Sequence, residues 1–232
     1  MSPTEPAAED FLAAGPGLSH RERLRLSRLR HPGRRLEFAD ARRLAKRLLR
    51  RVGVVNDCVR DEAISILPTV GPSERPRLWV GHVERPTDVS LAHSSGWVAA
   101  AVRVDGRVGV DLVVPSEVRP HRLAAWFSPA EHRLALEESL TLADLWAMKE
   151  AAFKATSELA PFRPGDYPVE ADRGWTAGGC PVRLEVAEGL TIAVAAPNRD
   201  ALRDASRVCV ERMRIPATPE TPETTGPAAT AD

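Results

Sequence analysis

The chain has 232 residues, of which 43% are hydrophobic, and its 32 basic residues are balanced by 32 acidic ones. This length is enough to bury one large core or two small ones. No stretch approaches the roughly 20 apolar residues of a membrane-spanning helix, and the first residues lack the features of a signal peptide, so we expect a soluble cytoplasmic protein. Three cysteines without metal-ligand spacing, Cys58, Cys180 and Cys209, are expected to be reduced structural thiols.

The order of segments along the chain predicts an α+β protein with two similar lobes. Residues 1–17 and 216–232 are rich in Pro, Ala, Thr and Glu and are predicted to be disordered. Between them we expect an N-terminal lobe over 18–106 and a C-terminal lobe over 107–215, related by a pseudo-twofold. Each lobe is predicted to be a small antiparallel sheet packed on a long helix, because each half has one principal helix followed by strands. The site is expected in the cleft between the lobes.

The first half of the chain is dominated by a basic segment. Residues 21–51 hold 13 of the 32 basic residues and only three acidic ones, so this segment is a candidate for binding polyanions. Apolar residues at helical spacing predict a helix over 36–52, which Gly53 ends. The Pro-rich stretch over 68–86 is interpreted as loop and short edge strands.

Two apolar runs, WVAAAVRV and RVGVDLVV, give the clearest strand pattern. They are separated by Asp105-Gly106, which favours a two-residue hairpin turn that would place Ala100 opposite Asp111. Asp111 would then share one face with Gly109, which leaves space around its carboxylate. An acid in a strand that is apolar on both faces needs a partner, and a loop arginine is one such partner.

The second half is predicted to contain a short helix near 128–138, a longer helix over 141–159 and three further strands. In the longer helix Lys149 lies in the middle of an apolar stripe, while Glu150 and Lys154, spaced i to i+4, flank it. One interpretation is a surface salt bridge beside a lysine whose stem lies along the apolar face. However, the chain has only three lysines, and two of them lie here. An ammonium acts as a point charge against phosphate, so the use of lysine instead of arginine at these two positions indicates a functional role.

Three segments then stand in a recognisable order: GVD at 109–111, WFSPAE at 126–131 and WAMKEAAFK at 146–154. Together they resemble the signature of the 4′-phosphopantetheinyl transferases, which is a strand G-[IV]-D, a turn F-[ST]-x-x-E and a helical W-x-x-K-E-x-x-x-K. The stretch SLAHSSG from Ser90 resembles the S-x-S-H-S segment of the larger, single-chain Sfp-like branch. RRLEFADAR resembles an R-R-x-E-F-x-x-x-R pattern of its N-terminal lobe. The resemblance covers roughly residues 18–194.

This resemblance implies a holo-[acyl-carrier-protein] synthase type of reaction. The phosphopantetheine arm of coenzyme A would be transferred, with Mg²⁺ as cofactor, to a serine of an apo acyl or peptidyl carrier protein, and adenosine 3′,5′-bisphosphate would be released. It also implies a monomer that binds neither membrane nor nucleic acid. The carrier and its pathway, whether fatty-acid, polyketide or nonribosomal-peptide biosynthesis, stay open.

The resemblance also implies roles for individual residues. Asp111 and Glu150 would hold Mg²⁺, for which two carboxylates are suitable ligands, and Lys154 would meet the pyrophosphate. Glu150 and Glu131 are both candidate bases for the serine proton, although Glu131 also fits a capping box with Ser128. Lys149 is expected to reach toward Asp111 or a coenzyme A phosphate. The residues expected to bind coenzyme A, besides Lys154, are Arg34, Arg42, Arg75, His93 and Ser94.

The chain departs from the family pattern at two positions. Val113 stands where many members carry a further acid, so one metal ligand is missing, and Ala92 stands where a serine often precedes the histidine. Val113 also suggests an alternative, a paralogue that binds coenzyme A or a carrier without transferring the arm. Two other classes of function are alternatives. One is a nucleic-acid-binding protein that uses residues 21–51, and the other is a hydrolase built on Ser90, His93 and Ser94, around which no nucleophile elbow is found.

Overall fold

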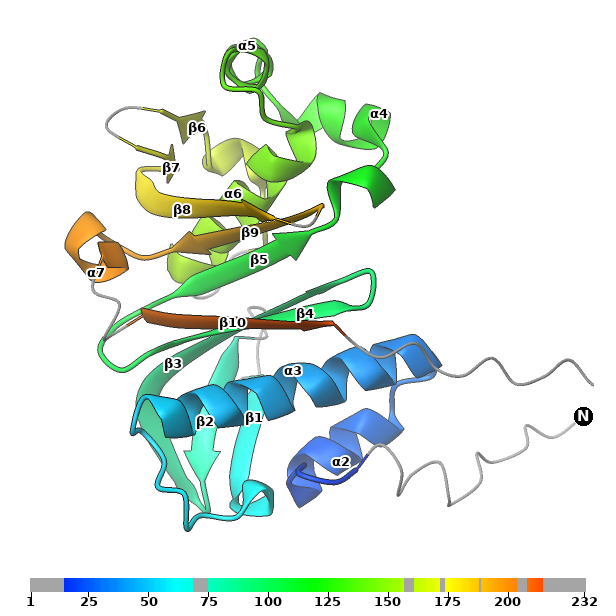
Figure 1. The fold of residues 1–232 in the computed structure, drawn as a ribbon, viewed down its shortest axis with the longest axis vertical. Helices are drawn as coiled ribbons and strands as arrows, with labels where there is room; N and C mark the ends of the chain where they lie inside the picture. Colours follow the sequence, from blue (N-terminus) through cyan, green and yellow to red (C-terminus); the bar gives the residue numbers. More distant parts are fainter. Residues whose placement is uncertain are drawn as a thin grey trace, which may run out of the picture.

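A computed structural model describes residues 15–68, 75–156, 161–171, 174–187, 189–203 and 208–214. It confirms the predicted α+β class with two antiparallel sheets, each packed on a long helix (Figure 1). A twofold relation between the lobes stays a prediction, and most of the predicted disorder lies outside the described residues. Among the described helices, none is long and apolar enough to cross a membrane.

The first lobe has one five-stranded sheet, in the order β1-β2-β3-β4-β10. Its long helix begins four residues earlier than predicted, because Pro32 suits the first turn of a helix, and Gly53 with a φ of +72° follows its end as expected. The elements of this lobe in chain order are α2 (His20–Ser27), α3 (Pro32–Arg51), η1 (Asp61–Ala63), β1 (Ile64–Pro68), β2 (Pro76–Val80), β3 (Val83–Ser94) and β4 (Trp97–Arg103).

The second lobe has the sheet order β5-β9-β8-β7-β6. The last strand, β10 (Val208–Arg214), returns to the first lobe and pairs with β4, so the two lobes are not simply consecutive along the chain. The other elements are β5 (Gly109–Val113), η2 (Pro115–Glu117), α4 (Pro120–Leu123), η3 (Ala124–Trp126), α5 (Pro129–Glu137), α6 (Leu142–Thr156), η4 (Pro164–Asp166), β6 (Val169–Glu170), β7 (Thr176–Ala177), β8 (Cys180–Ala187), β9 (Leu190–Ala195) and α7 (Arg199–Arg203).

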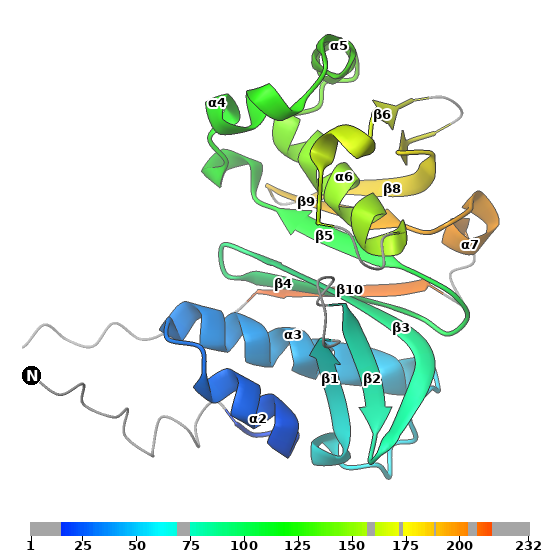
Figure 2. The ribbon, with the colours of Figure 1, turned by 180° about the vertical axis from the view of Figure 1, so that it is seen from behind.

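The two sheets are stacked between the two long helices, which gives the layers α3, first sheet, second sheet, α6 (Figures 1 and 2). On β4 the residues Val98, Ala100 and Val102 pack against α3. The alternate residues Ala99 and Ala101 pack into an apolar cluster with β5 and β9 of the other sheet. Both faces of these strands are therefore buried, which explains why their sequences are apolar runs without alternation.

The predicted hairpin at Asp105-Gly106 is wrong. Strand β4 is paired on its two sides with β3 and β10, and β5 pairs with β9, so Asp111 lies opposite Ala193. Residues 104–108 carry the chain from one sheet to the other instead. A local Asp-Gly signal favours a turn but does not select the strand's partner. A tight turn does join β3 to β4, at Ser95-Gly96, where both residues have positive φ (50° and 76°).

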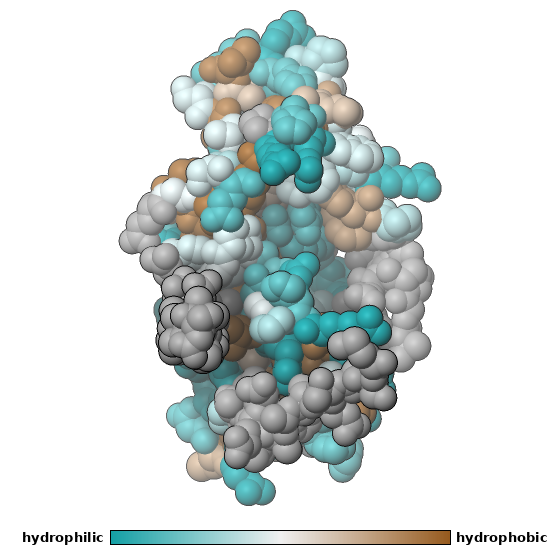
Figure 3. Space-filling model, turned by 90° about the vertical axis from the view of Figure 1, so that its right-hand side faces the viewer, coloured by the Kyte–Doolittle hydropathy of each residue, from teal (hydrophilic) through white to brown (hydrophobic). Residues whose placement is uncertain are grey.

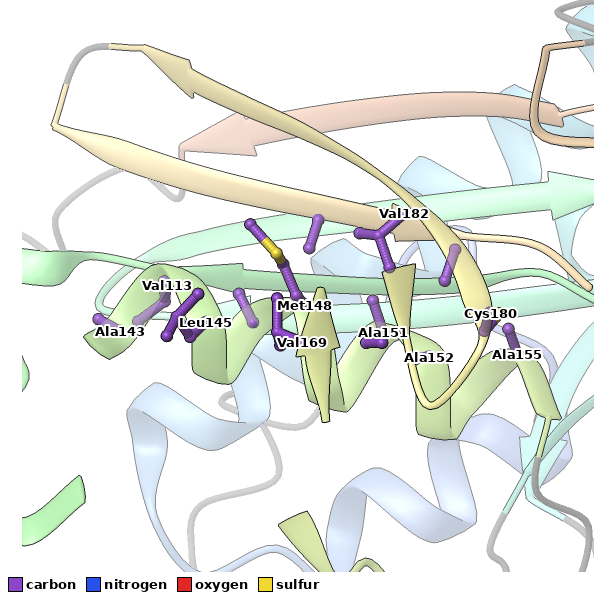
Figure 4. Close-up of a cluster of buried hydrophobic side chains, with 14 of the residues drawn as sticks. Val113, Ala143, Leu145, Met148, Ala151, Ala152, Ala155, Val169, Cys180 and Val182 are labelled. Carbon is purple, nitrogen blue, oxygen red and sulfur yellow. The ribbon is translucent and has the colours of Figure 1, made fainter. Parts of the chain in front are cut away.

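The core of the second lobe lies between α6 and its sheet (Figure 4). Small residues of α6, among them Ala151 and Ala155, let β5 approach the helix closely. A Cβ on Gly109 would lie 1.9 Å from the carbonyl oxygen of Ala151, so no side chain fits there. The space that Gly109 leaves beside Asp111 is thus filled by the helix backbone, and is not left open as the sequence suggested.

The two cysteines whose side chains are described, Cys58 and Cys180, carry free thiols. Burial raises the pKa of the Cys180 thiol to about 11, and its Sγ lies 3.0 Å from the carbonyl oxygen of Ala196. A thiol that stays protonated in this way is a packing group and not a nucleophile. Cys58, by contrast, is exposed, and the side chain of Cys209 lies outside the described part.

Candidate functional site

A cavity of about 540 Å³ lies where the first lobe meets the end of α6. Its walls come from α2, α3, β3 and the segment around Pro76 on one side, and from Phe153 and Lys154 on the other. The face in Figure 3 shows hydrophilic residues between the upper and lower lobes. The basic residues that line the cavity are Arg25, Arg34, Arg42, Arg75, His93 and Lys154.

Five of the six residues predicted to bind coenzyme A therefore line one cavity. The exception is Ser94, which follows His93 at the end of β3 but is not part of the cavity wall. The sequence did not identify Arg25 or Glu37, which also line the cavity. Arg25 belongs to the basic segment, but nothing in the sequence separates it from its neighbours. Glu37 lies one helical turn after Arg34, a spacing that places both on one face of α3.

Arg34 and His93 lie together at the cavity wall. Nη1 of Arg34 is 2.8 Å from the ring nitrogens of His93 and 3.2 Å from Oε2 of Glu37, which is itself 3.3 Å from His93 Nδ1. Burial lowers the pKa of His93, with Glu37 opposing and Arg34 reinforcing the shift. A neutral imidazole can accept a hydrogen bond from Arg34, and the side chain of Arg34 is 58% exposed. This guanidinium therefore has donors that face solvent.

Arg42, in contrast, is buried in the wall. Its Nε donates to the carbonyl oxygen of Ile66 at 3.1 Å and its Nη1 to that of Phe38 at 3.0 Å, and the guanidinium lies over the Phe38 ring. Burial lowers its pKa to about 10, although the charge of Glu22 opposes this shift. Two of the hydrogen-bond donors of Arg42 already bind backbone carbonyl oxygens. Its main contribution to the cavity wall is therefore its positive charge and its shape.

Lys154 joins the two predicted metal ligands. Its Nζ lies 2.7 Å from Oδ1 of Asp111, 3.3 Å from Oε1 of Glu150 and 3.1 Å from the carbonyl oxygen of Val110. Oε2 of Glu150 accepts a hydrogen bond from Trp146 Nε1 at 3.0 Å, which orients this carboxylate. Asp111 on β5 and Glu150 on α6 thus meet at one ammonium. The spacing in the sequence predicted the proximity of Glu150 and Lys154, but not the contact between Lys154 and Asp111.

Burial and charge oppose each other in this group. Burial raises the pKa of Asp111 to about 7, while Lys154 pulls it down and Glu150 pushes it up. For Lys154 burial lowers the pKa, but the charges of Asp111 and Glu150 outweigh burial and raise it above the usual value. The lysine is therefore held as a cation beside the two carboxylates.

Asp111 and Glu150 fit Mg²⁺, but they would supply only part of its ligands. Carboxylate oxygens are ligands that Mg²⁺ prefers, and Mg²⁺ commonly takes its other ligands from water and from phosphates of its substrate. Within the described ranges, no three His, Cys, Asp or Glu residues come together to hold a metal. Val113, where the sequence lacks a further acid, is 7% exposed and packs in the core of the second lobe.

Glu131 and Lys149 form a buried pair away from the cavity. Glu131 makes the predicted capping box with Ser128, and its Oε1 lies 2.6 Å from Lys149 Nζ and 3.0 Å from the backbone nitrogen of Val169. Lys149 also donates to the carbonyl oxygen of Pro164 at 3.0 Å. The expectation that Lys149 reaches toward Asp111 or a phosphate is wrong, because the apolar stripe turns it into the core of its own lobe.

The pKa of Glu131 reflects this network. Burial raises it, but the hydrogen bonds from Lys149 and from the backbone nitrogens of Ser128 and Val169 together hold it below its usual value. Both carboxylate oxygens are engaged. Glu131 is therefore an ionised structural acid in this conformation.

The serines near His93 do not form a nucleophilic arrangement. Ser90 Oγ accepts a hydrogen bond from the backbone nitrogen of Val110 at 3.0 Å. His93 pairs with Arg34 and Glu37 instead, so the hydrolase alternative receives no support from the geometry.

Comparison with known proteins concerns the second lobe. No curated protein matches the chain. Residues 107–175 match the family model described as the 4′-phosphopantetheinyl transferase superfamily. The matched segment contains Asp111, Glu131, Lys149, Glu150 and Lys154, while membership of the Sfp-like branch rests on the first-lobe motifs and stays a prediction. Through this segment, in which two carboxylates meet at Lys154, the second lobe is similar to the 4′-phosphopantetheinyl transferase superfamily.

Proposed function

We propose that the protein transfers the 4′-phosphopantetheine arm of coenzyme A to a serine of an apo acyl or peptidyl carrier protein, with Mg²⁺ as cofactor and release of adenosine 3′,5′-bisphosphate. The observation that carries this proposal is the position of Lys154. Its ammonium joins Asp111 and Glu150, and the same residue lines a basic cavity formed mainly by the first lobe.

The cavity supports coenzyme A as the donor because its lining suits a molecule with several phosphates. Six basic side chains face a single acid, Glu37, across a volume of about 540 Å³. Arg34 is the group best placed to bind a phosphate directly, because its side chain is 58% exposed and its partner His93 is held neutral by burial. Phe38, Leu91 and Phe153 add apolar surface, which fits the uncharged parts of the same ligand.

Asp111 and Glu150 would hold the metal, which when bound would neutralise charge on the pyrophosphate oxygens. Lys154 is the chain's own contribution at this position. Its ammonium is kept charged by the two carboxylates, so it can stabilise the negative charge that develops on the departing phosphate. Attack of the serine oxygen on phosphorus breaks the bond to the bisphosphate, and the serine proton must move to a base.

Glu150 is favoured over Glu131 as that base. The side chain of Glu150 is 31% exposed, whereas that of Glu131 is 5% exposed. A group that takes a proton from a carrier must be reachable by its serine. Glu131 is proposed to act indirectly, because it holds Lys149 and thereby the helix on which Glu150 and Lys154 lie.

The test is an intact-mass measurement on carriers. The purified protein is incubated with Mg²⁺, coenzyme A and a panel of apo carriers from fatty-acid, polyketide and nonribosomal-peptide systems, and one carrier class is expected to gain one phosphopantetheine arm. A chelator should prevent the gain. If no carrier gains mass while the folded protein binds coenzyme A, the transferase proposal fails and the non-transferring paralogue suggested by Val113 takes its place.

A further inference from the structure

Strand β5, which carries Asp111, has a free edge. In the described part of the second sheet it pairs only with β9, so the backbone groups of its other edge find no strand partner there. Unpaired backbone nitrogens that are buried cost free energy comparable to a lost hydrogen bond. The partners of this edge therefore have to come from outside the sheet.

Side chains of the first lobe take the place of the missing strand. The backbone nitrogen of Val108 donates to Asp88 Oδ2 at 2.8 Å, and that of Val110 donates to Ser90 Oγ at 3.0 Å. Asp88 and Ser90 are two residues apart on β3 and thus point to the same side, as the amides of Val108 and Val110 do. Two side chains of β3 thus set the register of β5 against the first lobe.

Arg75 locks this contact and extends it to α6. Its Nε donates to Asp88 Oδ1 at 3.0 Å and its Nη2 binds Asp88 Oδ2, so the pair is bidentate. Nη1 binds the carbonyl oxygen of Lys154, and Nη2 lies 3.4 Å from that of Val108. The side chains of Arg75 and Asp88 are 8% and 9% exposed. One buried guanidinium therefore joins β3, the start of β5 and the last turn of α6.

These contacts reach the atoms of the proposed site. Asp111 follows Val110 in the chain, and Lys154 Nζ binds both the carbonyl oxygen of Val110 and the carboxylate of Asp111. The second lobe has its own core and its own β5–β9 pairing. The contacts from the first lobe therefore fix where β5 and the end of α6, which already pack on each other, lie relative to the first lobe and the cavity.

We propose that Asp88, Ser90 and Arg75 form an interlobe clamp that positions Asp111 and Lys154 for the reaction. Asp88 and Ser90 are positioning residues that act through the backbone of β5, and neither belongs to the catalytic group. The expected effect on the rate rests on the proposed function, while the effect on β5 does not.

The variants Asp88→Asn and Ser90→Ala test the clamp. Asparagine keeps an oxygen for Val108 but leaves Arg75 without its counter-charge, and alanine removes the acceptor for Val110. Three quantities are measured: amide hydrogen exchange of residues 108–111, Mn²⁺ affinity by electron paramagnetic resonance in the presence of coenzyme A, and the steady-state kcat and KM with an apo carrier. Loss of a group that orients metal ligands typically lowers metal affinity or activity by about 10- to 100-fold.

For Asp88→Asn we expect a loss of this size in Mn²⁺ affinity and kcat, with little change in the KM for the carrier. For Ser90→Ala, which removes one neutral hydrogen bond, we expect a loss of about threefold to tenfold. Ser90→Thr keeps the hydroxyl and should restore Mn²⁺ affinity and β5 exchange. If Ser90 had only a structural role, Mn²⁺ affinity and β5 exchange would change together with the global stability of the protein, and would not recover in Ser90→Thr while that stability stays unchanged.

Matched controls come from the first lobe. Asp40→Asn removes an aspartate–arginine pair of comparable chemistry, in which Asp40 Oδ1 lies 2.7 Å from Arg43 Nη1 within α3. Ser65→Ala removes a buried serine whose hydroxyl bonds to Ser19. Neither touches β5, so both should leave β5 exchange and Mn²⁺ affinity within about twofold of the parent value.

The outcomes separate the clamp from the proposed function. If the parent protein transfers no arm but Asp88→Asn selectively loosens β5 and lowers Mn²⁺ affinity, the transferase proposal fails and the clamp stands. If the parent transfers the arm and neither Asp88→Asn nor Ser90→Ala changes β5 exchange or Mn²⁺ affinity, the clamp is overturned. It is also overturned if Asp40→Asn has the same effects as Asp88→Asn, or if β5 loosens without any loss of Mn²⁺ affinity.

Discussion

The two lobes of the protein contain the same arrangement of a capping serine, a buried glutamate and a buried lysine. In the first lobe Ser19 caps α2 and forms a capping box with Glu22, whose Oε2 lies 2.6 Å from Lys46 Nζ on α3. Oε1 of Glu22 accepts a hydrogen bond from the backbone nitrogen of Ile66 on β1 at 2.8 Å. A short helix, the long helix and the sheet are thus tied together at one carboxylate.

The second lobe repeats this pattern around Glu131. Ser128 caps α5, Lys149 on α6 lies 2.6 Å from the carboxylate, and the backbone nitrogen of Val169 on β6 donates to it at 3.0 Å. In each lobe the lysine also donates to the backbone. Lys46 donates to the carbonyl oxygens of Gly17 and Asp61, and Lys149 donates to that of Pro164. An internal duplication would produce such a repetition.

The lobes differ in the residues that follow the buried lysine. In α6 the next residue is Glu150, and Lys154 lies five positions after Lys149. In α3 the corresponding positions are Arg47 and Arg51, both exposed. The buried lysine therefore belongs to the framework of each lobe, and the proposed chemistry depends on the residues one and five positions later. Only the second lobe places an acid there, so the chain has one candidate metal site of this kind.

The largest effect that this comparison predicts concerns the free energy of unfolding. Lys46→Met or Lys149→Met leaves a buried glutamate without its counter-charge, and each should lower the free energy of unfolding by about 3–5 kcal/mol. Chemical denaturation monitored by circular dichroism measures this loss. Arg47→Met, on the exposed face of the same helix as Lys46, should stay within about 0.5 kcal/mol of the parent. A large loss for one lysine and a negligible one for the other would show that the two networks are not equivalent.

The next effect concerns activity and should appear in one lobe only. Glu150→Gln keeps an oxygen for Trp146 but removes the charge, and the rate of arm transfer should fall by on the order of 10²–10³-fold. Arg47→Gln changes the corresponding residue of α3 and should leave the rate unaltered. The rate is measured from the mass of the carrier over time, and Mn²⁺ affinity is measured beside it. A Glu150→Gln protein with the parent rate would remove Glu150 from the site.

The sequence predicted the parts of this arrangement that depend on local spacing. Ser128 and Glu131 stand three residues apart before an apolar segment, so the capping box could be recognised from the chain alone. Glu150 and Lys154 share a helix, so their proximity followed from the period of the helix. The five cavity residues were identified by resemblance to family motifs, and composition alone would not have separated Arg34 from the other arginines of residues 21–51.

The contacts that the sequence did not predict depend on packing between distant segments. The Asp105-Gly106 signal is local, whereas the choice of β9 as the partner of β5 depends on how the sheets pack. The sequence does not decide which carboxylate Lys149 meets, and only the folded lobe shows that its partner is Glu131. Nothing in the sequence singles out Asp88, because its partners Arg75 and Val108 meet it only when the two lobes are assembled.

The smallest predicted effect separates the two caps. Ser128 is exposed and its Oγ accepts one described hydrogen bond, from the backbone nitrogen of Glu131, so Ser128→Ala should cost about 1 kcal/mol. Ser19 is 3% exposed, and its Oγ accepts hydrogen bonds from Glu22 and from the hydroxyl of Ser65 at 2.8 Å. Because Ser19→Ala also leaves this second buried donor unpaired, it should cost about 1 kcal/mol more than Ser128→Ala.

A double-mutant cycle measured by chemical denaturation decides whether the hydroxyl of Ser65 causes this difference. In the Ser19→Ala background, Ser65→Ala should cost less than it does in the parent, because the hydroxyl that it removes no longer has its partner. The cycle with Ser128→Ala should be additive, since Ser65 belongs to the other lobe. Additive losses in both cycles would mean that the buried position of Ser19 matters for its packing alone, and that the two caps are equivalent in their hydrogen bonding.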